Sequence, residues 1–465
     1  MSASRALAAM LVLGACGSAP LWVGRSVDRV HRATITEDGA RVRLSIDLGA
    51  TRTYDAIAFD RIAWTSRDLL APAQRDGAWW MIDGAIDRGP FVAIGDVLAA
   101  GDHTLFAAER ADGWHVTRDG HEGDAFEAIE PGALLDPDHG SAAYVITRGG
   151  HEHAVHDDAL GPPCERVATL TLGAKGRMLA YLDRGARDRL LVDHREVATY
   201  DRVLELVVAR EEPHWAALVA AAESTLLVHD GATLANAPFF THLRISDDGA
   251  HVSCLSPAAD GASIDLVVDG AHVAHHRRID GDRLAFVPGD ARVVFVWEDS
   301  QGLRITLDGR ESDRYESIEG PTLASHRAGW VARRAEQSEV IIEGETIATE
   351  EWAGTLVLAS RGDGYAYVAR VGRDRFVVTS RGRWAMPRFF VDTLVLDDEG
   401  RHFAALVPDS AAHALSVWID GVPAVTLDEH ELGGAIAIEA GRAALGAVVR
   451  GVVRAERARA RHDSR

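Results

Sequence analysis

The chain of 465 residues has little of what several common kinds of site require. Its three cysteines are too few for a disulfide scaffold or an array of multi-cysteine zinc sites. Lysine occurs once, at Lys175, so arginine supplies nearly all the positive charge. Acidic residues outnumber basic ones by 70 to 49, which gives a formal net charge of −21. Because this charge repels a nucleic-acid backbone, we expect no nucleic-acid partner and a preference for cationic ones.

Long hydrophobic runs and familiar catalytic motifs are also missing. No segment reaches the 18 or so consecutive apolar residues that a membrane-spanning helix needs. The chain has no Gly-x-Ser-x-Gly nucleophile motif, no P-loop and no His-Glu-x-x-His. The apolar fraction of 47% is nevertheless that of a folded globular protein. These absences favour a role without catalysis and predict no cofactor.

Residues 1–15 have the features of a secretory signal, with one arginine, a short apolar run and small residues at the end. The run ends in Leu13-Gly14-Ala15-Cys16, which resembles the lipobox of bacterial lipoproteins. In that family the signal is cut before the cysteine, whose thiol then receives a diacylglycerol. The resemblance implies lipidation of Cys16, a linker over residues 16–29, and membrane attachment through this lipid only. Since Gly17 rather than aspartate follows, we expect the outer membrane of a bacterial envelope, facing the periplasm or the cell surface. An ordinary secretory signal is the alternative.

The rest of the chain repeats one pattern, an aliphatic run followed by an acid and often by glycine. We call the recurring position the turn acid; it returns every 35 to 39 residues, at Asp47, Asp83, Asp119, Asp157, Asp193, Asp230, Asp269, Asp308, Glu343, Arg381 (where arginine replaces the acid) and Asp420. Aspartate-glycine pairs supply the positive φ angles of tight hairpins, so these residues have a structural role as turns. The clear pairs are Asp83 and Gly84, Asp119 and Gly120, Asp230 and Gly231, Asp269 and Gly270, Asp308 and Gly309, and Asp420 and Gly421.

An aromatic residue commonly stands seven positions after the turn acid, as at Tyr54, Phe126, Tyr200 and Tyr315. Each unit therefore reads as four short strands; in one of them we expect strands at 284–287, 293–297, 303–307 and 315–318. Four strands in about 37 residues match one blade of a β-propeller. The fold class is thus all-β, a propeller of about eleven four-stranded repeats.

Two further motifs carry a resemblance to a known class. Ser246-Asp247-Asp248-Gly249 precedes one strand, and Leu179-Ala180-Tyr181 lies in another. Over roughly residues 30–452 the chain resembles bacterial WD-type propeller repeats of the TolB-like periplasmic class. That resemblance implies the propeller fold and implies nothing about activity.

Eleven units exceed the usual four to eight blades of a propeller. We expect two tandem propellers, over residues 30–225 and 226–453, and one oversized ring is the alternative. The alanine-rich segment 213–224 could start a helix at Pro213, although the preserved spacing favours strands. Residues 454–465 form a basic tail, which we expect to be solvated.

Three groups of residues are candidates for chemistry. Cys164 takes the place of the aromatic residue in its unit and Cys254 lies in a strand of another, so we expect two buried thiols rather than a disulfide. His151, His153 and His156 form a weak candidate metal site, in which His151 and His153 share a face because they are alternate residues of a strand. Asp136-Pro137-Asp138-His139-Gly140 looks like a calcium loop but lacks the glutamate at position twelve, so a blade turn is expected.

Three functions remain open on this evidence. The first is a lipid-anchored envelope propeller that binds a protein or peptide, without catalysis. The second is an envelope hydrolase or lyase that acts on a glycan or small molecule at the central channel. The third is a purely structural spacer. Fold alone cannot choose between them.

Overall fold

The computed structural model describes residues 22–25, 32–39, 41–46, 51–65, 68–137, 139–387, 393–409 and 414–428. The predicted signal, Cys16, the turn acid Asp47 and the basic tail lie outside these ranges. Within them, nearly all regular structure is strand, and no helix is long and apolar enough to cross a membrane.

The strands form eleven antiparallel sheets, which we number blades 1 to 11 in chain order. Blades 1 to 4 contain β1 (Trp22–Arg25), β2 (Arg32–Asp38), β3 (Arg41–Ile46), β4 (Thr51–Tyr54); β5 (Ala56–Ile57), β6 (Ala63–Trp64), β7 (Leu69–Arg75), β8 (Ala78–Asp83), β9 (Ile86–Phe91); β10 (Ala93–Ala100), β11 (His103–Arg110), β12 (Gly113–Arg118), β13 (His121–Glu122); and β14 (Ala128–Leu135), β15 (Ala142–Arg148), β16 (His151–His156), β17 (Ala159–Leu160). Blade 2 also holds a short 3-10 helix, η1 (Phe59–Arg61), and pairs β6 with β7 beside its main order β5-β7-β8-β9.

The remaining blades have four strands each, hydrogen-bonded in chain order. Blades 5 to 8 contain β18 (Val167–Gly173), β19 (Met178–Arg184), β20 (Asp188–Val192), β21 (Arg195–Tyr200); β22 (Arg202–Val208), β23 (Trp215–Ala221), β24 (Ser224–His229), β25 (Ala232–Ala237); β26 (Thr241–Ile245), β27 (Val252–Pro257), β28 (Ile264–Val268), β29 (Ala271–His276); and β30 (Arg278–Phe286), β31 (Val293–Asp299), β32 (Gly302–Leu307), β33 (Arg310–Glu311). Blades 9 to 11 contain β34 (Ser317–Ala324), β35 (Arg327–Arg334), β36 (Gln337–Ile342), β37 (Glu345–Glu350); β38 (Trp352–Leu358), β39 (Tyr365–Val371), β40 (Asp374–Thr379), β41 (Gly382–Met386); and β42 (Val395–Leu396), β43 (Phe403–Asp409), β44 (Ala414–Ile419), β45 (Val422–Asp428).

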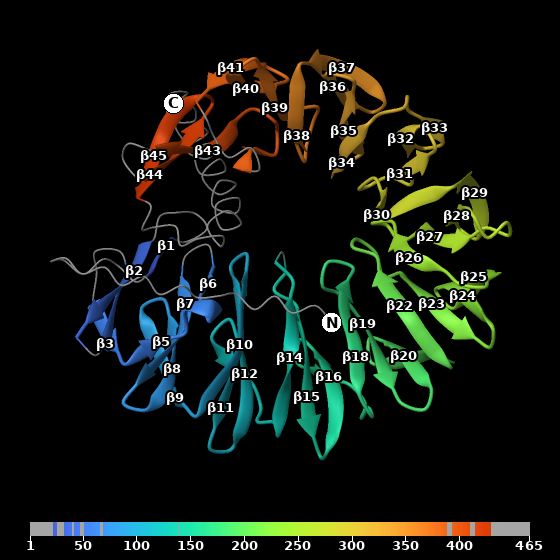
Figure 1. Ribbon diagram of the computed structural model, residues 1–465. Helices are drawn as coiled ribbons and strands as arrows, with labels where there is room; N and C mark the ends of the chain where they lie inside the picture. The colour runs from blue at the N-terminus through green and yellow to red at the C-terminus, as the bar shows by residue number, and fades with distance from the viewer. Residues whose placement is uncertain are drawn as a thin grey trace, which may run out of the picture.

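The blades follow one another around a single ring-like arc, and the first strand of most blades, for example β10, β26 or β34, lies toward the centre (Figure 1). First strands of successive blades contact each other, for example β10 with β14 and β34 with β38. The chain is therefore a β-propeller, as the repeat predicted, and its sheets are stacked side by side around the arc.

The hydrophobic core lies between neighbouring blades. The second strand of a blade is buried on both faces, as in β23, whose residues Trp215–Val219 are all buried. One cluster joins Leu218 and Leu227 of blade 6 to Leu243, Val252 and Cys254 of blade 7. Because each sheet covers its neighbour, no blade buries its faces alone.

The arrangement favours one ring over two tandem propellers. Residues 225 and 226, where the two halves were expected to meet, are adjacent in β24, and β24 pairs with both β23 and β25. The core continues from blade 6 into blade 7, and Figure 1 shows no break in the arc there. The described residues thus form one row of eleven blades, which is the alternative arrangement. The segment that could have started a helix at Pro213 is β23, as the spacing predicted.

One strand assignment from the sequence was wrong. In blade 8 the fourth strand is β33, which begins directly after the turn at Asp308 and Gly309, rather than at Tyr315. Tyr315 forms an isolated bridge with Leu303, and Ile318 already belongs to the first strand of blade 9. The tight turn is the reason, because a two-residue hairpin brings the next residues back into pairing at once.

Candidate functional site

The turn acids have a shared local structure. Asp119, Asp157, Asp230, Asp269 and Asp308 all have φ between 47° and 54°, and four of them are followed by glycine at φ of 75° to 83°. Two successive positive φ angles define the hairpin turn whose twist matches that of the strands, and aspartate and glycine tolerate them best. These four aspartate-glycine pairs therefore have the turn conformation that the sequence predicted. The expectation was wrong at Asp83, which ends β8 without a positive φ, so that only Gly84 of this pair has one, at 54°.

The carboxylate of the turn acid has a second task. One oxygen accepts a hydrogen bond from the main-chain N–H that opens the second strand of the same blade. The donor is Thr104 for Asp119, Trp215 for Asp230 and Val252 for Asp269, at 2.7, 3.0 and 2.8 Å. This bond links the start of the second strand to the end of the third. Because an ionised acceptor makes a stronger hydrogen bond than a neutral amide oxygen does, an acid rather than asparagine recurs at this position.

The other oxygen meets an imidazole in four blades. The pairs are His103 with Asp119 at 3.0 Å, His214 with Asp230 at 2.6 Å, His251 with Asp269 at 2.7 Å and His402 with Asp420 at 2.5 Å. In each blade the histidine stands one residue before the N–H donor, so one carboxylate binds both. Sequence analysis missed these histidine–aspartate pairs, although a histidine 16 to 18 residues before the turn acid is the signal.

The weak metal candidates from the sequence do not come together. His151 is exposed, whereas His153 is buried with its Nδ1 2.9 Å from the carbonyl oxygen of Gly161. The Nε2 of His156 lies 2.8 Å from the carbonyl oxygen of Gly176. The rings of His153 and His156 are thus each engaged by a main-chain carbonyl, and within the described residues these three histidines form no metal-ligating group.

Both described cysteines are buried free thiols, as expected. Cys164 forms an isolated bridge with Glu152, and Phe126 with Trp114 and Tyr315 with Leu303 form the same bridge in their own blades. Cys164 therefore occupies the aromatic position of the repeat. Burial raises the pKa of each thiol to about 12. Neither cysteine has the properties of a nucleophile.

A polar groove of about 880 Å³ lies between blades 3 and 4. The charged residues of its lining come mostly from the turns at the outer strands of both blades. Five carboxylates and two guanidinium groups line it, those of Asp119, Glu122, Asp124, Asp157, Asp158, Arg118 and Arg148.

The groove has a fixed floor and a free rim. On the floor, the Arg118 guanidinium donates to Asp157 and, at 3.1 Å, to Asp158, and so joins the two blades. The Tyr144 ring is buried beneath it; burial first, and then the Asp158 charge, raise the pKa of its hydroxyl to about 12, so it stays neutral. Asp124 and Asp158 are exposed at the rim, although Asp158 also accepts from Arg118. Because five carboxylates outnumber two guanidinium groups in the lining, negative charge remains available to a ligand.

One segment singled out in the sequence, residues 136–140, borders this groove. His139 and Gly140 line it, and the main-chain N–H groups of these residues are bound by Asp136, at 2.8 Å to the carboxylate and 3.0 Å to the carbonyl. The described residues of this segment lie between β14 and β15, where the sequence predicted a blade turn. The groove itself was not predicted, because its residues belong to two repeats, whose turn acids Asp119 and Asp157 are 38 positions apart.

Carboxylates on the inner strands bind main chain of the next blade. Asp96 accepts from the N–H of Gly132 at 2.8 Å, Glu205 from Leu243 at 2.9 Å, and Glu319 from Thr355 at 2.6 Å. These acids hold successive blades in register, which is a structural use of carboxylates on the strands nearest the middle of the arc.

Comparison with known proteins adds no assignment. No protein-family model and no curated protein matches the chain. Among solved structures, a eukaryotic initiation factor matches at 10% identity and a TM-score of 0.38, covering 70% of this chain and 96% of that one. The β-propeller domain of Cps50 (Swd1) from Myceliophteria thermophila matches at 14% identity and 0.25, covering 53% and 95%. The tricorn protease matches at 10% and 0.26, covering 84% and 46%. The propeller assignment here is made on the sheets themselves.

Proposed function

We propose that this protein is a binding scaffold whose groove between blades 3 and 4 holds a basic segment of an envelope protein. The observation that carries the proposal is the groove's excess of carboxylates at an exposed rim above a rigid, inter-blade floor. A cationic peptide gains Coulomb attraction there, and the rigid floor means that little ordering is needed on binding. The chain's net charge of −21 extends the same charge complementarity to longer range.

Binding is favoured over catalysis by how the acids are used. A hydrolase at the central channel needs carboxylates or histidines that converge without structural partners. Asp96, Glu205 and Glu319, on the strands nearest the centre, instead accept main-chain N–H groups of the next blade. This supports a scaffold, whose inner acids maintain the ring while its outer turns provide the contact surface.

Peptide binding to variants of the rim tests the groove. We expect an arginine-rich fluorescent peptide to bind with an affinity that falls as salt rises, and a glutamate-rich peptide of equal length not to bind. Replacing both Asp124 and Asp158 by lysine should weaken binding about tenfold or more, measured by fluorescence anisotropy. Glu223 and Glu345, exposed acids away from the groove, provide the matched pair of lysine variants, which should bind as the unchanged protein does. Equal binding of both peptides, or an equal loss in the matched pair, would contradict the proposal.

We further propose that Cys16 is lipidated and holds the propeller at the membrane. Three acyl chains would make attachment effectively permanent, because each buried methylene contributes about 0.8 kcal/mol. Cells supplied with a fatty-acid analogue should label the unchanged protein and fail to label Cys16→Ala. Label retained in that variant would refute the lipid anchor and would leave the peptide-binding groove untouched.

A further inference from the structure

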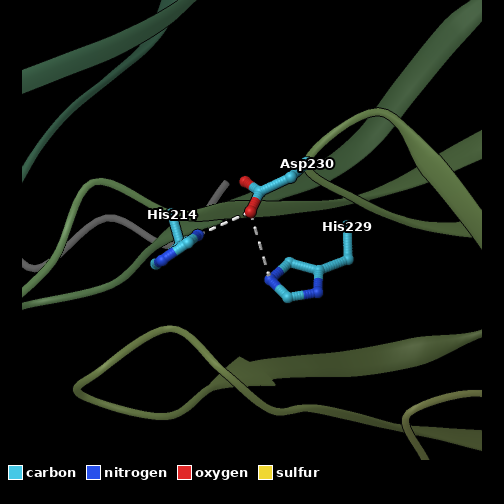
Figure 2. Close-up of side chains that lie close together, drawn as sticks. All are labelled: His214, His229 and Asp230. Carbon is cyan, nitrogen blue, oxygen red and sulfur yellow. Dashed lines mark hydrogen bonds and ion pairs between the residues drawn. The ribbon is translucent and has the colours of Figure 1, made fainter.

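Among the four blades with a histidine–aspartate pair, blade 6 alone has a histidine directly before the turn acid. The residue before the turn acid is Arg118 in blade 3, Val268 in blade 7 and Ile419 in blade 11, but it is His229 in blade 6. His229 ends β24 beside Asp230, and His214 precedes β23, so adjacent antiparallel strands bring all three side chains together (Figure 2). In the part of the chain that the structure describes, no other three histidine, cysteine or acidic residues meet in this way.

The three side chains present their ligand atoms to one point. Nδ1 of His214 lies 2.6 Å from Oδ2 of Asp230, and Nε2 of His229 lies 3.7 Å from the same oxygen. All three ligand atoms are within 4.8 Å of one another. Ligands at about 2.0 to 2.1 Å from a tetrahedral zinc ion stand about 3.3 Å apart, so small rotations of the two rings give the required spacing.

His229 supplies a second, independent sign of a missing ligand. Its Nε2 is buried and has no hydrogen-bond partner, and 3.7 Å to the carboxylate is too long for such a bond. A buried polar atom left unpaired costs about 1 to 3 kcal/mol, so native structures rarely keep one without a reason. A cation between His229 and Asp230 would satisfy this nitrogen.

The surroundings hold the ligands in place. The other oxygen of Asp230 is fixed by the N–H of Trp215 at 3.0 Å. The turn of blade 7 packs directly against His214, since a Cβ added at Gly249 would lie only 2.3 Å from the Cβ of His214. The side chains of His214 and Asp230 remain 41% and 38% exposed, so solvent can reach an ion there.

We propose that His214, His229 and Asp230 form a binding site for a divalent transition metal, of which zinc is the representative ion. Two imidazole nitrogens and one carboxylate oxygen form a donor set that binds such metals in preference to calcium or magnesium. The metal takes the position of the Nδ1 proton of His214, whose ring then carries its proton on Nε2. Three protein ligands and an open side leave coordination positions for water or for a ligand group from a partner.

Cobalt(II) is the probe of choice, because it replaces zinc and gives visible absorption when bound by nitrogen and oxygen ligands. Full-length protein without a histidine tag should bind one equivalent of Co²⁺ that zinc then displaces, followed by absorption and by calorimetry. His229→Val installs the residue that blade 7 carries at this position, and it should weaken binding about 100-fold or more. Circular dichroism should show that the variant folds; His229→Gln, closer in size, serves the same purpose if it does not.

The matched control is His251→Ala, which removes the histidine of the two-residue pair in blade 7. This variant should bind Co²⁺ as the unchanged protein does, because Val268 leaves that pair without a third ligand. Unchanged binding in His229→Val and His229→Gln would overturn the proposal. A loss in His251→Ala equal to that in His229→Val would overturn it as well, since the loss would then not be specific to the three proposed ligands of blade 6.

Discussion

Cys164 shows how a single residue can be read from its place in the repeat. It fills the position of Phe126 and Tyr315 in other blades and makes the same bridge, so its role is packing. Its Sγ lies 3.6 Å from the carbonyl oxygen of Pro162, a weak contact consistent with a neutral thiol. Cys254, fully buried between blades 6 and 7, is equally enclosed.

Both thiols should therefore resist reaction in the folded protein. Burial raises the pKa of each thiol to about 12, whereas an exposed thiol titrates near 8.5. Because only the thiolate reacts, a protein with Cys16→Ala should show almost no reaction with Ellman's reagent at pH 8.5, and two thiols once urea unfolds it. Rapid reaction of the native protein at that pH would contradict the assigned burial.

At the scale of elements, the turn conformation and the atoms next to it determine how far a glycine substitution lowers the free energy of unfolding. The turn at Asp269 and Gly270 joins β28 to β29, and the turn at Asp308 and Gly309 joins β32 to β33. The two glycines have φ of 82° and 75°, so an L-residue is strained at both. They differ in surroundings, because a Cβ at Gly270 would lie 2.4 Å from the carbonyl oxygen of Leu234, while nothing lies within 4 Å at Gly309.

This contrast predicts two different losses of stability. Gly309→Ala should cost about 1 kcal/mol through backbone strain alone. Gly270→Ala should cost about 1 to 3 kcal/mol more, because the turn must also shift away from blade 6. Urea unfolding midpoints measure both, and Gly309→Ala is the control for Gly270→Ala. Equal midpoints would show that blade 6 and blade 7 are less closely packed at this turn than described.

At the scale of the whole molecule, the single row of blades has consequences that two propellers would not. Contacts run from each blade to the next, and the inner acids Asp96, Glu205 and Glu319 each link to the following blade. In such an array, stability spreads from neighbour to neighbour, and among the described residues no linker separates independent halves.

Limited proteolysis distinguishes these arrangements. Two tandem propellers would give two resistant fragments that meet near residues 225 and 226. The single row predicts no cleavage there, because both residues lie in β24 with a paired strand on each side. A non-specific protease followed by mass spectrometry should find no major cut between residues 215 and 237 in the native protein. Urea-treated protein, which should be cut throughout, is the control, and a stable pair of halves would refute the single row.

Sequence by itself determined the features that one repeat can encode. The spacing of the turn acids, the aspartate-glycine turns, the alternating strands and the buried place of Cys164 all follow from local propensities, which act within a single blade. The expected fourth strand at Tyr315 was wrong, because the sequence pattern does not fix where a strand begins, whereas the two-residue hairpin does.

Tertiary structure decided everything that depends on two blades or on two strands meeting. Whether the eleven repeats form one row or two depends on the small rotation between neighbouring blades. That rotation is set by contacts between blades, so the residues of a single repeat do not predict it. The groove combines Arg118 of blade 3 with Asp157 of blade 4, and the proposed metal site combines His214 with His229 and Asp230 across a strand pair. In sequence Arg118 and Asp157 are 39 positions apart, and His214 is 15 positions before His229 and 16 before Asp230. Only folding brings these charges and nitrogen atoms within binding distance.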